Sequence, residues 1–311
     1  MTDKAVMAPA RGEVPALPST GERLLTETFD RYSIEHLHRY AIATSLCENL
    51  DVLDIASGEG YGSNLLAKEA KSVHGVDISE DAIEHAKAKY ISSNLHYVVG
   101  SADRIPLPTQ SVDRVISFET LEHHDLHEEM FAEVKRVMRA DGLLMMSTPD
   151  KLNYTDVPKQ RNEFHVKELY LEEFRTLVQG HFKNVVILFQ EVGYFGLIAP
   201  ETAGSYPFRH YAGDFDHVET IATLPRPVYN ICLASDVELP EKIASVYSGQ
   251  LALENMLKQF EAKFEAKVTN LQRIVDNAHS EIRNLTTSPS YLVGRAITSP
   301  YRLIRNVLKN Q

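Results

Sequence analysis

The sequence has no tryptophan, no long apolar run and only two cysteines, and each absence removes a class of protein. Cys47 and Cys232 are too few and too far apart for a disulfide framework or a zinc cage. No apolar run approaches the ~20 residues that span a bilayer, and the opening MTDKAVMAPA does not resemble a secretory signal. We therefore expect a cytoplasmic protein.

Positive charge is scarce too, except at one end of the chain. The 311 residues carry a formal net charge of −11, which argues against a nucleic-acid partner. Residues 286–311 are the exception, because they contain four basic residues and no acid. The remaining composition, with 43% hydrophobic and 24% charged residues, is that of an ordinary globular protein.

Short apolar runs alternate with amphipathic stretches from Asp51 onward. Near-continuous apolar strands separated by helices indicate a parallel sheet that is covered on both faces, and so an α/β fold. Helices are expected to begin near Tyr61, Glu80, Asp125 and Lys167. Strands are expected over 51–57, 72–78, 95–101, 113–119, 142–149, 184–193 and 226–235.

Composition divides the chain into four segments. The first is rich in alanine and proline and is predicted to be a disordered leader, and the second is the α/β domain. Within that domain, an aromatic insertion over 193–224 is either a lid or a packed surface excursion. A coiled coil and a basic amphipathic tail follow. The four segments span 1–20, 21–238, 240–285 and 286–311.

The third segment has an apolar seam. Steps of alternately four and three residues from Val246 to Leu285 meet twelve positions, nine of them apolar. This pattern is typical of a coiled coil, which predicts a homo-oligomer. The alternative is one long helix that folds back on the domain.

Three glycines, Gly58, Gly60 and Gly62, follow the first expected strand in VLDIASGEGYGSNLLA. Such density indicates a tight turn that a ligand approaches closely. The carboxylate of Asp54 could bind an ammonium group. Asp77 could accept hydrogen bonds from the paired hydroxyls of a ribose, and Asp103 could accept one from the amine of an adenine. Together these groups describe S-adenosylmethionine.

Five motifs in order resemble those of the class I S-adenosylmethionine-dependent methyltransferases, over about Glu22 to Ser235. They are VLDIASGEGYG, GVDIS, GSADRIPLP, VDRVISFETLEH and RVMRADGLLMMSTPD. The resemblance implies a Rossmann-like sheet of seven mostly parallel strands with helices on both faces. Two departures are Ala56 in place of a first glycine and RADG in place of KPGG. An alanine at this position would still let the cofactor come close to the loop backbone, provided that the alanine φ is negative.

The resemblance also implies which residues hold the cofactor. The methionine moiety would face Asp54 and the backbone of the glycine loop, the ribose would lie beside Asp77, and the adenine beside Asp103. Carried over position by position, the set is Asp54, Ala56, Gly58, Gly60, Asp77, Ile78, Ala102, Asp103 and Phe118.

Four residues past the fourth and fifth strands are candidates for catalysis: Glu119, Glu122, His123 and His165. In one interpretation a histidine, with Glu119 nearby, acts as general base for an acceptor hydroxyl. In another, the four side chains bind a divalent ion, Mg or Mn. A structural or cofactor-positioning role is the third. Oxygen is the preferred acceptor atom, because nitrogen needs no such base.

The prediction of the substrate depends on a finer resemblance, to methyltransferases associated with bacterial surface-polysaccharide (O-antigen, lipopolysaccharide) synthesis. It implies a saccharide hydroxyl, with Tyr206, Phe208 and Tyr211 stacking on the sugar, and a methyl group that caps the chain. The alternatives are a phenol or quinone acceptor, and a non-catalytic scaffold for glycan-assembly enzymes. The basic tail predicts contact with the inner-membrane surface or with a glycosyltransferase.

Overall fold

The computed structural model of the chain describes residues 14, 17–18, 23–27, 29, 31–193, 195–201, 210–213, 218–221, 224, 227–240 and 244–309. Most of the predicted leader over 1–20 lies outside this set. The chain forms two compact units, Met1–Leu253 and Glu254–Gln311, each of which we describe by itself.

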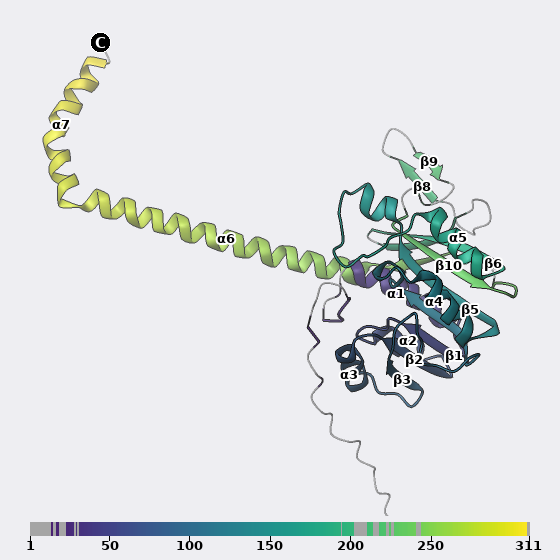
Figure 1. Cartoon of the computed structure of the whole chain (residues 1–311). Helices are drawn as coiled ribbons and strands as arrows, with labels where there is room; N and C mark the ends of the chain where they lie inside the picture. The colour runs from purple at the N-terminus through teal and green to yellow at the C-terminus, as the bar shows by residue number, and fades with distance from the viewer. Residues whose placement is uncertain are drawn as a thin grey trace, which may run out of the picture. The chain divides into compact units, whose positions relative to one another are not determined.

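A mixed sheet runs through the first unit (Figure 1). Strands β3, β2, β1, β4 and β5 are parallel neighbours in that order, and β10 lies antiparallel between β5 and β6. The strands of this part are β1 (Asp51–Ile55), β2 (Ser72–Asp77), β3 (Leu95–Val99), β4 (Val112–Phe118), β5 (Met138–Pro149), β6 (Asn184–Val192) and β10 (Tyr229–Ser235).

The prediction of seven strands is too low, because the described residues place nine in this sheet. Strands β7 (Phe195–Pro200) and β11 (Ser245–Ser248) extend it beyond β6. Strand β11 lies at the edge, and its sequence SVYS alternates polar with apolar residues, so it lacks the continuous apolar run of a central strand. Strand β7 pairs with both β6 and β11. A separate hairpin of β8 (His210–Gly213) and β9 (Val218–Ile221) lies in the segment expected to be loop-like.

Helices cover both faces of the sheet, as predicted. Successive residues of a strand point to opposite faces of the sheet, and each face has its own apolar cluster. Val52 and Met145 therefore pack on one face, and Leu53 and Met146 pack on the other. The first face packs against α1 (Arg31–Ser45), α2 (Tyr61–Leu66) and α3 (Glu80–Lys89). The second packs against α4 (His127–Val137) and α5 (Leu171–His181).

The second unit consists of helical residues of α6 (Gln250–Thr287) and of α7 (Pro289–Lys309). Helix α6 begins later than the predicted seam, since Val246 lies in β11 and Gly249 separates the strand from the helix. In the part of the chain that is described, no helix combines the length and the hydropathy required to cross a bilayer.

Candidate active site

A cavity of about 850 Å³ opens at the carboxyl ends of the parallel strands in the first unit. Its size is that of a small-molecule site. The loops after β1, β2 and β3 form one side, which we call the loop wall: Ala56, Gly58, Asp77, Ile78, Ala102 and Asp103. The opposite side, the histidine wall, comes from separate segments: Glu35, Glu122, His123, Tyr154, His165 and Tyr229.

The three glycines have different roles. Gly58 has φ 55°, and an added Cβ there would meet no atom within 4 Å. In contrast, a Cβ on Gly60 would lie 2.7 Å from the Ala86 Cβ, and one on Gly62 would lie 2.0 Å from the Tyr40 ring. Gly58 therefore leaves space at the cavity, while the other two let α2 and its neighbours pack closely.

Ala56 does not have the negative φ that would make the alanine harmless. Its φ is 57°, in the left-handed region, which costs a residue with a Cβ roughly 1–2 kcal/mol. Such strain persists only where the surrounding structure imposes it, and it concentrates at functional sites. Ala56 lies in the cavity wall, so the loop keeps this conformation at the place where a ligand would bind.

Asp54 is fully buried behind the loop and is not part of the cavity lining. Its carboxylate accepts hydrogen bonds from Ser63 Oγ at 2.6 Å and from Tyr40 Oη at 3.1 Å. Burial raises its pKa to about 7, although both hydrogen bonds act in the opposite direction. Its observed contacts are therefore within the protein, and Gly60 likewise lies behind the lining.

Asp77 occupies the expected position at the end of β2. Its carboxylate accepts the backbone N–H groups of Gly58 at 2.8 Å and of Ser79 at 2.9 Å, and it lines the cavity. The neighbouring Ile78 is 76% exposed, an unusual state for a large apolar side chain. Ala102, Asp103 and Phe118 lie on the same cavity.

These residues fit S-adenosylmethionine. The carboxylate of Asp77 has acceptor capacity left for ribose hydroxyls, and the exposed Ile78 offers an apolar surface for an adenine. The buried hydroxyl of Ser57 has no hydrogen-bond partner, so a polar ligand group would relieve an uncompensated cost.

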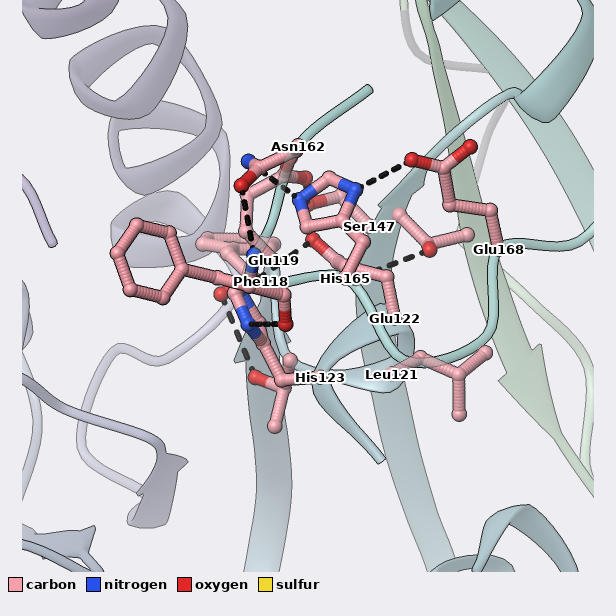
Figure 2. Close-up of polar contacts among 12 residues, drawn as sticks. Phe118, Glu119, Leu121, Glu122, His123, Ser147, Asn162, His165 and Glu168 are labelled. Carbon is pink, nitrogen blue, oxygen red and sulfur yellow. Dashed lines mark hydrogen bonds and ion pairs between the residues drawn. The ribbon is translucent and has the colours of Figure 1, made fainter. Parts of the chain in front are cut away.

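His165 has a partner on each ring nitrogen, as Figure 2 shows. Its Nδ1 lies 2.5 Å from Glu168 Oε1, and its Nε2 lies 2.9 Å from the Asn162 amide nitrogen. The Asn162 oxygen accepts the Phe164 N–H at 3.0 Å, which fixes the orientation of the amide. Consequently Nδ1 donates to Glu168 and Nε2 carries the lone pair.

His123 has the same tautomer. Its Nδ1 lies 3.1 Å from the Phe164 carbonyl oxygen, so this nitrogen donates and Nε2 carries the lone pair. The two imidazole rings meet edge to face, with centroids 5.2 Å apart. Their segments, η1 (Leu121–His123) and the loop before α5, are held together by hydrogen bonds from Val166 N and Lys167 N to the Glu122 carbonyl oxygen.

Glu122 is buried beside the two histidines. Thr148 Oγ1 donates to its Oε2 at 3.1 Å, while Oε1 has no hydrogen-bond partner. Burial, reinforced by the nearby Glu119, raises its pKa well above the usual range. Ligand atoms of Glu122, His123 and His165 all lie within 4.8 Å of one another, so three of the four predicted metal ligands converge.

Glu119 does not belong to that cluster of described residues. Its Oε1 instead accepts hydrogen bonds from Arg39 Nη1 at 2.6 Å and Ser147 Oγ at 2.7 Å. Its φ of 52° is a second strained position at the cavity. The observed contact of the Glu119 carboxylate is therefore an ion pair with a buried arginine, and its expected role as a metal ligand or base stays a prediction.

Sequence reasoning missed this arginine and its partners other than Glu119. Arg39 is fully buried, with Nε donating to Gln190 at 2.8 Å and the guanidinium 4.5 Å from the Tyr229 ring centroid. Tyr229 Oη donates to Glu35 at 2.6 Å, and burial raises the pKa of Glu35. A charged pair inside the apolar pattern of α1 was the available signal, since Glu35 and Arg39 both lie on its buried face.

The predicted sugar-stacking residues have no described position at the site. Tyr206 and Phe208 lie outside the described residues, and Tyr211 belongs to strand β8. Tyrosines outside the insertion line the cavity instead: Tyr32, Tyr40, Tyr61, Tyr154 and Tyr229.

Comparison with known proteins agrees with the geometry of the loop wall. Residues 53–146 match the family model described as a methyltransferase domain. A probable S-adenosylmethionine-dependent methyltransferase of Mycolicibacterium smegmatis is 33% identical over 169 residues, which cover 53% of this chain and 64% of that protein. A protein of Mycobacterium tuberculosis with the same description is 34% identical over 167 residues, covering 52% and 60%.

A fatty-acid O-methyltransferase of M. smegmatis is 26% identical over 166 residues, covering 51% of this chain and 60% of that protein. The chain thus spans less than two thirds of the length of these curated relatives. A solved S-adenosylmethionine-dependent methyltransferase from Thermotoga maritima is 16% identical, with a TM-score of 0.48, over 66% of this chain and 91% of that one. Residues 53–146 are thus similar in sequence to a methyltransferase domain, and the two mycobacterial relatives that are 33% and 34% identical are described as S-adenosylmethionine-dependent.

Proposed function

We propose that the protein is an O-methyltransferase that uses S-adenosylmethionine. The observation that carries the proposal is that the loop wall and His165, whose other ring nitrogen bonds to Glu168, line one cavity. Asp77, Ile78 and the Gly58 backbone would hold the cofactor, whose sulfonium supplies an electrophilic methyl group. The tasks left to the protein are to align the acceptor and to remove its proton.

His165 is suited to accept that proton. Glu168 fixes the tautomer with the lone pair on Nε2 and stabilises the imidazolium that forms. His165 and Glu168 side chains are only 7% and 8% exposed, which strengthens their interaction. Asn162 occupies Nε2 at present, and an acceptor hydroxyl would take that place as a hydrogen-bond donor.

A divalent ion held by Glu122, His123 and His165 is a second hypothesis for the same residues. Metal-binding histidines usually donate their other ring N–H to a carboxylate or a carbonyl. Here His165 donates to Glu168 and His123 to the Phe164 carbonyl, while Glu122 Oε1 has no hydrogen-bond partner. An ion in this place would polarise the acceptor oxygen.

We propose a saccharide hydroxyl of a surface polysaccharide as the acceptor, on the resemblance given above and on the lining of the histidine wall. Tyr154 of this wall and Tyr32 of the same cavity offer ring faces next to hydroxyls, while Glu35 and His36 add further polar atoms. Such a mixture suits a ligand with apolar C–H faces and many hydroxyls better than a long acyl chain.

The test measures transfer of a tritiated methyl group into three acceptors: lipid-linked glycan from the source organism, a catechol and a fatty acid. Each is assayed before and after chelation and dialysis. Transfer into the glycan alone supports the proposal, and transfer into the catechol or fatty acid alone overturns the saccharide assignment. Activity that survives chelation favours the histidine base, and activity restored by Mg²⁺ or Mn²⁺ favours the ion. Cofactor binding without any turnover would indicate a scaffold.

A further inference from the structure

Helix α6 carries an apolar stripe that no described residue of its own unit covers. Its side chains, apart from the smaller Ala278, are between 44% and 68% exposed. The same helix has glutamate, lysine and asparagine on its other faces. The stripe consists of Leu257, Phe260, Phe264, Val268, Leu271, Val275, Ala278, Ile282 and Leu285.

The spacing of the stripe differs from the strict alternation expected from the sequence, which would place Lys267 and Glu281 in the seam. Two successive four-residue steps, Phe260 to Phe264 and Phe264 to Val268, shift the register by one position. A shift of this kind is a stutter, which locally unwinds a coiled coil. With it every seam position is apolar, and the stripe stays within an arc of about 100° on a regular helix.

We propose that this stripe packs against the α6 stripe of a second copy of the chain, as a parallel two-stranded coiled coil. The stripe exposes on the order of 800 Å² of apolar surface, which is about what one partner contributes to a standard specific interface. Monomers rarely leave so large a contiguous apolar patch exposed. An isolated helix is also only marginally stable in water unless a face is packed.

The residue types of the seam select the number of strands. After the stutter, β-branched Val268, Val275 and Ile282 occupy one seam position of the heptad, and Leu271, Ala278 and Leu285 occupy the other. In parallel coiled coils, valine or isoleucine at position a with leucine at position d favours two strands. In a parallel pair both copies of α7 follow from the same end of the coil.

Sedimentation velocity of the full chain at micromolar concentration tests the pairing. We expect a dimer, which Ala278→Lys shifts at least tenfold toward monomer. Ala266→Lys, the same change on the opposite face of α6, leaves the dimer intact. Thermal unfolding of the first unit controls for folding in both variants. A monomeric or trimeric wild type, or equal effects of the two substitutions, overturns the proposal.

A cysteine variant tests the direction. In a parallel pair, residue 285 faces its own counterpart, so Leu285→Cys should form a disulfide-linked dimer under mild oxidation. Cys47 and Cys232 are both buried and serve as the internal background in the unsubstituted chain. Dimers that form without this cross-link would be antiparallel, which contradicts the proposal.

Helix α7 carries an independent inference. At 100° per residue, its basic positions Arg295, Arg302, Arg305 and Lys309 fall within an arc of about 80°. Apolar residues occupy the opposite half of the helical period, and no acid interrupts either half. The tail carries +4 in a chain of −11, so the remaining residues carry −15.

We infer that α7 binds an anionic lipid surface. A helix with one apolar half and one basic half lies in the interface plane of a membrane, and each cation strengthens its attraction to anionic lipid by about fivefold. A parallel α6 pair would present two such helices, which raises the avidity without any new contact.

Co-sedimentation of the full chain with vesicles tests this inference. We expect retention on phosphatidylcholine vesicles that contain one third phosphatidylglycerol, and loss of most of it on phosphatidylcholine alone or in high salt. Ile297→Asn on the apolar half should reduce retention several-fold, whereas Thr298→Asn on the polar half should not. The inference is overturned if the chain is not retained on any vesicle, or if it is retained equally on neutral vesicles. An α7 helix that instead docks on the acidic first unit would give no retention.

Discussion

The two walls of the cavity are built in opposite ways. The loop wall comes from short turns after consecutive parallel strands, and its backbone N–H groups bond to a carboxylate of the same short segment, since Ser79 and Gly58 lie 2 and 19 residues from Asp77. The histidine wall joins side chains that are far apart in the chain, and so do the contacts behind it: Arg39 reaches Glu119, Ser147 and Gln190, which are 80, 108 and 151 residues away.

This difference separates binding from chemistry. A wall of backbone groups and glycines is adapted to a constant ligand such as a cofactor. A wall of long-range side-chain contacts can change with the acceptor while the fold stays the same. Substitutions in the first should therefore alter cofactor affinity, and substitutions in the second should alter turnover or stability.

The largest effect is expected for His165→Ala. Loss of a general base typically lowers turnover by about 10²–10⁴, so kcat should fall by that factor while the dissociation constant for S-adenosylmethionine changes less than twofold. Asp77→Ala should do the reverse, because this carboxylate lines the loop wall. Stopped-flow turnover and calorimetric titration measure the two quantities.

His123→Ala is the matched comparison, since both rings line the cavity and meet edge to face. It should also reduce kcat far more than affinity. If His165→Ala weakened cofactor binding as much as turnover, the division between the two walls would be wrong and the histidine would be structural.

Arg39→Met is expected to have the next largest effect, on stability. Removing one partner of a buried ion pair costs about 3–5 kcal/mol, because the other charge stays buried without compensation. Arg39 bonds to Glu119, Gln190 and Ser147. Urea unfolding at constant pH measures the loss. Arg139→Met, whose side chain is 37% exposed in its pairs with Asp51 and Asp113, should cost only about 0–1 kcal/mol, and equal losses would contradict the argument.

The loop wall could be predicted from sequence because its signals are local. The glycines, Asp54 and Asp77 lie within 24 residues, and the period of the apolar strands assigns them to one edge of the sheet. Even so, the sequence could not show that Asp54 turns into the interior toward Tyr40 and Ser63. A strand-end acid looks the same whether it faces a ligand or a buried hydroxyl.

The histidine wall could be predicted only in part, since proximity in space has no local signal. The motif ETLEH placed Glu119, Glu122 and His123 at the correct edge, but the buried Arg39 that pairs with Glu119 lies 80 residues earlier. Strands β7 and β11 were missed for a related reason: FGLIAP and SVYS are short, and they form strands through pairing with neighbours rather than through their own pattern.

Asp54→Asn should change how stability depends on pH. Burial raises the pKa of Asp54 to about 7, so between about pH 4 and pH 7 the folded chain binds a proton that the unfolded chain has lost. The free energy of unfolding of the wild type must fall as pH rises through this window, by on the order of 4 kcal/mol relative to the variant. Parallel stability curves for the two proteins, measured without cofactor, would show that Asp54 is ionised in the fold.

The smallest effect is expected for Ala56→Gly, and its sign is informative. Glycine relieves the strain of φ 57°, roughly 1–2 kcal/mol, but loses about 0.5–1 kcal/mol through its greater freedom in the unfolded chain. The net result is a gain of about 0.5–1 kcal/mol, measurable by thermal unfolding. Ala67→Gly, where φ is −63°, should instead destabilise the protein. If both substitutions lowered the free energy of unfolding, the loop would be relaxed in solution and the fold would not impose its strained shape. The loop wall would then form only around its ligand.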